Sequence, residues 1–447
     1  MESTTTSGAE TGLVESSVTE IDQQQAVDDA PTPISVEYEQ DDLEVSTDTS
    51  DLVQVMLEGD SITVEGSGAT VDGGVVTITS AGEYGITGTL DDGQIIVDTQ
   101  DEETVYLILD GVDITCSTSA PIYVSNAEKT VITLADGIEN TITDGASYVF
   151  EDAESDELNA AVFSKDDLTI NGSGSLTVNA NYNNGIASKD DLKITGGDIT
   201  VTAVNDGIKG RDTVAVLDGT ITVNAGGDGL KSNNDEDPEK GYVAIEGGTL
   251  DITAGMDGIQ AQTNLLVSGG NITISSGSSG SADSGKGLKA GVNVTIEDGA
   301  IEIDAVDDAV HSNDSIVING GDMILASGDD GVHADTSLEI NGGDLTVVQS
   351  YEGIESQAIV INDGTMHLIS SDDGINGSTG GGGWGAPGSG DSSLVISGGD
   401  VFGDGGCDCI YVNGTGTMNE GVVILNGSAV GDNGALDVDG RLEIHGG

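Results

Sequence analysis

The stretch YNNGIASKDDLKITGGDITVTA, residues 182–203, is followed directly by VNDGIKGRDTVAVLDGTITVNA, residues 204–225. The two copies align without a gap, with apolar residues and glycine pairs in the same places. Further copies follow in register, including GMDGIQAQTNLLVSGGNITIS, VDDAVHSNDSIVINGGDMILAS and SYEGIESQAIVINDGTMHLIS, the last ending at Ser370. A period near 22 residues indicates a solenoid with one supersecondary unit per repeat.

Each copy contains three short runs of alternating apolar residues, separated by Asp-Gly or Gly-Gly turns. Coils of this kind, stacked about 4.8 Å apart, form parallel sheets around a continuous apolar column. The sequence therefore predicts an all-β fold with almost no helix, a single-stranded parallel β-helix that is right-handed because parallel crossovers are. A β-propeller or sandwich would repeat in longer units of about 40 residues or more. The glycine-rich nonapeptide of calcium-binding β-rolls does not recur here.

One inward position of the repeat is always apolar, and it predicts a single stacked column inside the solenoid. Its members are Ile208, Leu230, Ile259, Leu288, Val310, Val332, Ile354 and Ile375.

The chain divides into three parts. Residues 160–447 carry the regular coils, and residues 51–159 have the same composition with a looser period, which is typical of the opening coils and cap of a β-helix. Residues 1–50 are polar and acidic, and we expect a disordered tether. The sequence stops in mid-coil at RLEIHGG, residues 441–447, so we expect the C-terminus to be truncated.

The chain has 80 acidic and 11 basic residues, a formal charge of −69. This charge argues against nucleic acid and anionic membranes as partners and favours cations. No segment approaches the roughly 18 to 20 apolar residues of a membrane span. Residues 1–10 lack a signal pattern, but polar tethers often follow one. We therefore expect an extracellular protein, either secreted or held at the cell surface as a lipoprotein.

Acidic residues recur at one turn position of the repeat. Stacked carboxylates about 4.8 Å apart repel by roughly 1 kcal/mol per neighbouring pair in water, and calcium could offset that repulsion. A solvated column of Asp-Gly turns is the alternative. Lys286 interrupts the column and would neutralise its neighbours. The predicted calcium ligands are Asp206, Asp228, Asp257, Asp308, Asp330 and Asp373.

Three residues after each of these positions lies a second column, in which scarce cationic side chains gather. It predicts a stripe of hydrogen-bond donors for an acidic polysaccharide. Internal salt bridges to the acid column are the alternative, and a lysine near calcium could also be the base of a β-eliminating lyase. The candidate carbohydrate ligands here are Lys209, Lys231, Lys289, His311 and His333.

Two aromatic residues are candidates for stacking on a sugar ring. Trp384 is the only tryptophan and lies in the insertion STGGGGWGAPGSG, residues 378–390. Tyr351 precedes Glu352. Large amphipathic rings of this kind pack flat surfaces while keeping a polar edge in water.

The motifs NDGIKG, GDGLKSNNDEDPEKGY, GKGLKAG, DDAVHS, DDGVHAD and SDDGING resemble a known family. It is the family of calcium-containing, carbohydrate-binding parallel β-helices that look like polysaccharide lyases. The likeness covers about residues 52–447. It implies an extracellular protein that binds cellulose and acidic plant sugars such as polygalacturonate, with calcium held at the six matching aspartates.

We therefore expect a carbohydrate-binding β-helix with calcium and without catalysis. Its partners would be cellulose or an acidic plant polysaccharide such as pectin. A pectate-lyase-like enzyme and a purely structural surface protein or adhesin are the two alternatives.

Overall fold

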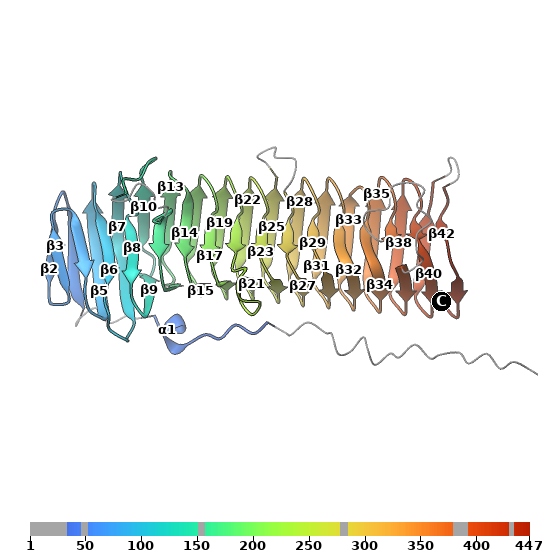
Figure 1. Cartoon of the computed structure of the whole chain (residues 1–447), viewed down its shortest axis with the longest axis horizontal. Coiled ribbons are helices and arrows are strands. Elements are labelled where there is room, and N and C mark those ends of the chain that lie inside the picture. The colour runs from blue at the N-terminus through green and yellow to red at the C-terminus, as the bar shows by residue number, and fades with distance from the viewer. Residues whose placement is uncertain (1–33, 46–51, 151–156, 278–284, 379–391, 429–432) are drawn as a thin grey trace, which may run out of the picture. The chain divides into compact units, whose positions relative to one another are not determined.

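Each strand of the repeat pairs with the strand one repeat further along the chain. Ile186 pairs with Ile208, and Ile208 with Leu230, each 22 residues apart and in parallel register. The structure is a computed structural model that describes residues 34–45, 52–150, 157–277, 285–378, 392–428 and 433–447. These belong to one compact unit, Ile34–Gly447. Figure 1 shows the strands of its successive coils side by side.

The 43 described strands form one connected sheet, which is organised as three parallel ladders. A coil contributes one strand to each ladder, because strand n pairs with strand n+3 through the regular repeats. Four longer strands, β5, β7, β32 and β34, pass from one ladder to another.

The first ladder contains the strands β4 (Val75–Ile78), β6 (Gln94–Asp98), β8 (Ile122–Asn126), β11 (Ala160–Ser164), β14 (Asn184–Ser188), β17 (Ile208–Gly210), β20 (Leu230–Ser232), β23 (Ile259–Ala261), β26 (Leu288–Ala290), β29 (Val310–Ser312), β32 (Val332–Ile340), β34 (Ile354–Ile361), β36 (Ile375–Gly377), β39 (Ile410–Val412) and β42 (Leu436–Val438).

The second ladder contains β7 (Val105–Cys116), β9 (Lys129–Leu134), β12 (Asp167–Gly172), β15 (Asp191–Ile194), β18 (Thr213–Val216), β21 (Tyr242–Ile245), β24 (Asn264–Val267), β27 (Asn293–Ile296), β30 (Ser315–Ile318), parts of β32 and β34, β37 (Ser392–Ile396), β40 (Gly414–Met418) and β43 (Leu442–Ile444).

The third ladder contains β1 (Val53–Gly59), β5 (Gly82–Leu90), part of β7, β10 (Glu139–Asp144), β13 (Ser175–Ala180), β16 (Asp198–Ala203), β19 (Thr220–Ala225), β22 (Thr249–Ala254), β25 (Asn271–Ser276), β28 (Ala300–Ala305), β31 (Asp322–Ser327), β33 (Asp344–Gln349), β35 (Thr365–Ser370), β38 (Asp400–Gly405) and β41 (Val422–Asn426).

The first coils differ from the rest. β2 (Ile62–Glu65) pairs antiparallel with β1, and β3 (Ala69–Asp72) pairs antiparallel with β4. These two hairpins precede the parallel coils and account for the looser period of the sequence there. The only helix among the described residues is α1 (Gln40–Leu43). The prediction of an all-β, solenoid-like chain with almost no helix is confirmed.

The predicted apolar column is present. Its eight side chains are at most 1 % exposed and follow one another in register from Ile208 to Ile375. Leu230 and Ile259 are 29 residues apart yet directly paired, so the insertion between them leaves the ladder without disturbing it.

Residues 34–45 fall within the expected tether, but they have a defined place in the structure. Asp42 is fully buried, and its carboxylate contacts Lys129 Nζ at 2.6 Å and Lys193 Nζ at 3.4 Å. Thr169 also donates a hydrogen bond to it at 2.6 Å. These partners lie on β9, β15 and β12, so the segment crosses the outside of the second ladder near α1 (Figure 1). None of the described helical structure has the length and hydrophobicity that a bilayer crossing requires.

We predict that Asp42→Ala releases this segment, because it leaves two buried lysines without their shared carboxylate. Breaking a buried ion pair in this way costs about 3 to 5 kcal/mol. Hydrogen exchange should show loss of protection at the amides of residues 42 and 44, which are bonded within the segment, while the ladder amides stay protected. Glu44→Ala, at an exposed position of the same segment, is the control. Unchanged protection in Asp42→Ala would show that the ion pairs do not hold the segment.

Candidate functional site

The acid column predicted from the repeat is a hydrogen-bonded ladder of side chains. One carboxylate oxygen of each acid accepts the backbone N–H of the equivalent residue in the next coil: Asp228 N donates to Asp206 Oδ1 at 3.2 Å, and Asp257 N donates to Asp228 Oδ1 at 2.9 Å. The same contact joins Asp330 N to Asp308 Oδ1 at 3.0 Å. All five carboxylates are buried, so the predicted stacking is confirmed and each acid ties two coils together.

The second oxygen of each acid faces a cationic side chain of the second column. These pairs are Lys209–Asp206 at 3.1 Å, Lys231–Asp228 at 2.6 Å, Lys289–Asp257 at 3.0 Å, His311–Asp308 at 2.8 Å and His333–Asp330 at 2.8 Å. The five cationic residues form one row on the first ladder. Of the two interpretations of this row, the distances support internal ion pairing over a free donor stripe.

The ion pairs change how readily these groups titrate. Burial disfavours charge on Lys231, but the carboxylates of Asp206 and Asp228 outweigh it and raise its pKa. Burial likewise opposes ionisation of Asp308, yet His311 and Lys286 hold its pKa well below the usual range. Lys286 lies 2.8 Å from that carboxylate and neutralises it, as its place in the column predicted.

Beyond His333 the row changes from cationic to acidic and polar. Glu355 and then Asn376 occupy the next two positions, and in the described part of the chain no lysine or arginine pairs with the column acids Glu352 and Asp373. Burial, together with the nearby charges of Glu355 and Asp330, raises the pKa of Glu352 to about 9. Burial raises the pKa of Asp373 to about 6. These buried carboxyl groups therefore resist ionisation, because no lysine or arginine of the described residues offsets their charge.

An unpaired oxygen lies in the same place. Asn376 Nδ2 donates to Glu352 Oε2 at 2.5 Å and to Glu355 Oε1 at 3.3 Å, while Asn376 Oδ1 is buried and has no hydrogen-bond partner. A buried amide oxygen without a partner costs about 1 to 3 kcal/mol. Carboxylate and amide oxygens are the ligands that calcium prefers, so Glu352, Asp373 and Asn376 are the residues here that could hold such an ion. Among the six predicted ligands, Asp373 alone lacks a cationic partner within the described residues.

Cationic side chains gather at the other end of the row. A shallow depression of about 510 Å³ is lined by Lys189, Lys209 and Arg211, with the buried ring of Phe163 also in its wall. Lys189 pairs with Glu157 at 2.9 Å, and Arg211 pairs with Glu236. Glu236 is exposed, and exposed ion pairs contribute only about 0 to 1 kcal/mol, so another carboxylate could replace Glu236 at little cost. Glu157 is half-buried and also pairs with Lys165 at 2.7 Å.

Lys189 and Arg211 were not among the residues selected from the sequence. The signal was present, because SKDD recurs at residues 164–167 and 188–191 and GRDT follows at residues 210–213. The predicted cation column lies three residues after the Asp-Gly turn, whereas these cations lie two positions further on.

A third surface, on the outside of the third ladder, combines apolar and aromatic side chains. Ile324, His367, Phe402 and Ile424 lie in one row of paired residues on β31, β35, β38 and β41, with Thr346 of β33 between the first two. The rings of His367 and Phe402 stack with centroids 4.7 Å apart and planes 9° from parallel. We call this the aromatic face. The sequence reasoning missed it because insertions separate Phe402 from His367 by more than one period.

The two predicted stacking residues have different outcomes. Tyr351 is 47 % exposed and lies beside the acidic half of the column, where a hydrogen bond with Asp372 raises the pKa of its hydroxyl to about 12. Trp384 lies outside the described residues.

Fold and surfaces together define a class of protein: a β-solenoid whose coils are joined by paired side chains and whose outer faces present carboxylates, a cationic depression and stacked rings. Residues 72–331, more than half of the chain, match the family described as "Carbohydrate-binding domain-containing protein". The chain therefore belongs to this family of carbohydrate-binding domain proteins.

Two relatives can be compared directly. A carbohydrate-binding domain-containing protein of Acetivibrio thermocellus is 48 % identical over 128 residues, which are 29 % of this chain and 45 % of the relative, so the match spans less than half of that protein. The solved structure of the polysaccharide lyase-like protein from C. thermocellum, as a gadolinium derivative, is 43 % identical. It superimposes with a TM-score of 0.50 and covers 56 % of this chain and 96 % of that one.

We predict that, without divalent cations, stability falls as pH rises from about 5 to 9. Burial raises the pKa of Asp330 to about 7. Like Glu352 and Asp373, it keeps its proton in the folded state at pH values where the unfolded chain has lost it. Burial opposes charge on His333, but Asp330 raises its pKa to about 9, and its loss of charge acts in the same direction. The melting temperature in a chelator should fall by about 3 °C or more across this range.

The matched comparison is Glu352→Gln, which should flatten the pH dependence. Glu302→Gln, at an exposed position on β28, should leave it unchanged. Equal slopes in wild type and Glu352→Gln would show that the buried charge of Glu352 does not govern stability.

Proposed function

We propose that this chain is an extracellular, non-catalytic carbohydrate-binding protein, wound as a right-handed parallel β-helix, that holds an acidic plant polysaccharide and uses calcium. The winding follows the hand of parallel crossovers. The observation that carries the proposal is the cationic depression: in a chain with a formal charge of −69, three of 11 basic residues line one hollow.

The depression suits a uronate. Lys189 and Arg211 already bind carboxylates there, those of Glu157 and Glu236, so the geometry for a sugar carboxylate is formed by residues of the chain itself. Arginine can hold a carboxylate with two parallel hydrogen bonds. A polyanion approaching elsewhere would meet the repulsion of the whole chain, which restricts binding to this region or to places where a divalent cation bridges.

The same contacts argue against lyase chemistry. A β-eliminating lyase needs a neutral lysine or arginine base, whereas Lys231 has a raised pKa and Lys209 and Lys289 are held by Asp206 and Asp257. A lysine kept charged is a poor general base at neutral pH. The lyase-like relative therefore supports the fold and binding, not cleavage.

Calcium is proposed at Glu352, Asp373 and Asn376, with Asp408 of the next coil nearby in the column; the N–H of Asp408 donates to Asp373 Oδ1 at 2.9 Å. The buried carboxyl groups, which no lysine or arginine of the described residues offsets, and the unpaired amide oxygen support this location. The other five predicted acids, from Asp206 to Asp330, already have partners for both oxygens.

A second candidate ligand is a neutral glucan such as cellulose, favoured by the aromatic face. The stacked rings of His367 and Phe402, with the half-exposed isoleucines around them, offer a flat apolar surface for sugar rings. An adjacent depression of about 500 Å³ is lined by Asp363, Asp400 and Glu420. Carboxylates accept hydrogen bonds from sugar hydroxyls and repel uronates, so this face suits an uncharged polymer.

Both polymers occur outside cells, which supports a secreted or surface-held protein; residues 1–33 of the expected tether lie outside the described residues.

We predict that the two surfaces separate in a retention assay. Lys189→Ala with Arg211→Ala should reduce retention on polygalacturonate at least tenfold and leave cellulose binding unchanged, because it removes two of the three cations that line the depression. Phe402→Ala should have the opposite pattern. Lys286→Met, which removes one cation buried in the column, is the control for loss of positive charge away from the depression. Retention on polygalacturonate that persists in the double variant would contradict the depression as the site. Release of unsaturated uronides, followed by ultraviolet absorbance, would contradict the non-catalytic role.

We also predict that millimolar calcium raises the melting temperature of chelator-treated protein, because an ion that binds only the folded column stabilises it by mass action. The increase should shrink in Asn376→Ala and in Asp373→Asn, and persist in Asp257→Asn, whose carboxylate has a lysine partner. Melting curves that overlay with and without calcium would contradict the calcium site.

A further inference from the structure

Two consecutive coils carry the same pattern of acid, histidine and outer oxygen. Residues 308–313 read DAVHSN and residues 330–335 read DGVHAD. In each, the aspartate three residues before the histidine is buried, and the residue two positions after the histidine offers an amide or carboxylate oxygen. The chain has only 4 histidines, and two of them occupy this one place.

The buried aspartates set the orientation of both rings. His311 Nδ1 lies 2.8 Å from Asp308 Oδ2, and His333 Nδ1 lies 2.8 Å from Asp330 Oδ2. An ionised carboxylate can only accept, so both Nδ1 atoms carry protons, and the Nε2 atoms are the ring nitrogens that point away from the column, where His333 Nε2 can donate to Asp335. A carboxylate that fixes the far nitrogen of a histidine is the common arrangement behind metal-binding imidazoles.

Each free nitrogen faces an oxygen at the surface. His333 Nε2 lies 3.3 Å from Asp335 Oδ1, and His311 Nε2 lies 2.9 Å from Asn313 Oδ1. The two histidine side chains retain 12 % and 21 % of their exposure, so an ion from solvent can reach them.

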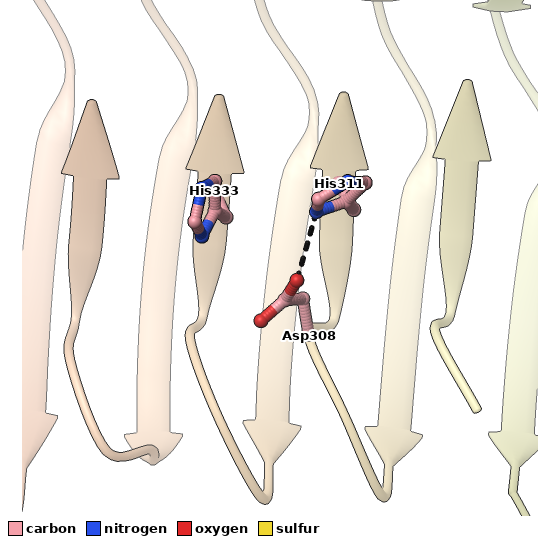
Figure 2. A group of neighbouring side chains, drawn as sticks. All are labelled: Asp308, His311 and His333. Atoms are coloured by element: carbon pink, nitrogen blue, oxygen red, sulfur yellow. Dashed lines mark hydrogen bonds and ion pairs between the residues drawn. The ribbon is translucent and has the colours of Figure 1, made fainter. Parts of the chain in front are cut away.

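The two rings are neighbours. His311 and His333 are register partners on β29 and β32, and their ring centroids are 5.2 Å apart. Figure 2 shows them at the same level of adjacent strands, with Asp308 below His311. Ligand atoms of Asp308, His311 and His333 lie within 4.8 Å of one another. For one tetrahedral ion with bonds of 2.0 to 2.1 Å, rotation of the two histidine side chains would bring their Nε2 atoms to roughly 3.4 Å from each other.

The surrounding charge favours a cation. Glu355 Oε2 is 3.6 Å from His333 Nδ1, and its ligand atoms form a second cluster with Asp330 and His333 within 4.8 Å. Lys289 and Lys286, the nearest lysines in the row and column, are bound to Asp257 and to Asp307 and Asp308. Neither of these lysines pairs with Asp330 or Glu355, the two acids beside His333.

We propose that His311 and His333 bind one divalent transition-metal ion of the zinc class through their Nε2 atoms, with Asp335 as the oxygen ligand and Asp308 and Asp330 as positioning residues. The ion links two coils from outside the solenoid. Imidazole suits zinc and its neighbours in the first transition row, whereas calcium takes oxygen ligands. This site is therefore distinct from the calcium site proposed at Glu352, and it does not depend on carbohydrate binding.

The test is calorimetric titration of untagged, chelator-treated full chain with Zn²⁺ in millimolar calcium, which keeps oxygen-only sites filled. One zinc ion per chain is expected. His311→Gln or His333→Gln should weaken zinc binding at least tenfold, and Asp330→Asn about tenfold by releasing the ring. His445→Gln is the matched control, since His445 also lies beside a carboxylate, Glu443, at 3.1 Å. Unchanged zinc affinity in the His311→Gln, His333→Gln double variant would overturn the site.

X-ray absorption at the zinc edge of the wild-type complex provides a measurement that no folding defect can mimic. Two imidazole nitrogens in the coordination shell are expected. A shell of oxygen atoms only, or displacement of zinc by an equal concentration of calcium, would overturn the proposal.

Discussion

Stacking identical positions one coil apart brings like charges together, and the structure depends on how that repulsion is relieved. In the regular coils, each buried aspartate of the column uses one oxygen for the backbone N–H of the next coil and the other for a lysine or histidine. Unpaired buried carboxylates would be costly, whereas these are hydrogen-bonded on both sides. The column therefore adds a polar ladder to the apolar one inside, and both tie coil to coil with the same period.

The side chain that pairs with the column acid changes along the chain, and each candidate site lies where a different partner is present. Near Lys209 and Arg211 three cationic side chains line one depression, and each of them is paired with an acid. In the middle of the column, Asp228 and Asp257 are each paired with one lysine. At His311 and His333 the cationic partner becomes an imidazole, which can exchange a proton for a metal ion. From Glu352 onward no lysine or arginine of the described residues pairs with the column acids, and the buried amide oxygen of Asn376 has no hydrogen-bond partner. One repeated geometry thus underlies the proposed carboxylate, transition-metal and calcium sites.

The acid and cation columns are largely buried, whereas the aromatic face lies on the outside of the third ladder. Inside the solenoid every repeat position is constrained by its neighbours above and below, whereas the outer side of the third ladder is constrained only by the strand twist and by solvent. Substitutions there, such as Ile324 and Phe402 in a row that carries threonine in earlier coils, do not disturb the ladder. The outer side chains of this ladder can therefore change without disturbing the buried columns.

The sequence by itself determined the coil, the apolar column from Ile208 to Ile375 and the alignment of the acid and cation columns, because a parallel ladder forces residues one period apart to be neighbours. It also identified Lys286 as the interruption. Tertiary structure decided what those neighbours do. Whether Lys209 faces solvent or Asp206 depends on side-chain direction, which periodicity does not encode. Two contacts join residues at separations that no repeat length predicts: residues 34–45 dock on Lys129 and Lys193, and His367 stacks on Phe402. The N-terminal segment and the insertions lie outside the period. The lack of a hydrogen-bond partner for the Asn376 amide oxygen likewise depends on side-chain positions that the period does not specify.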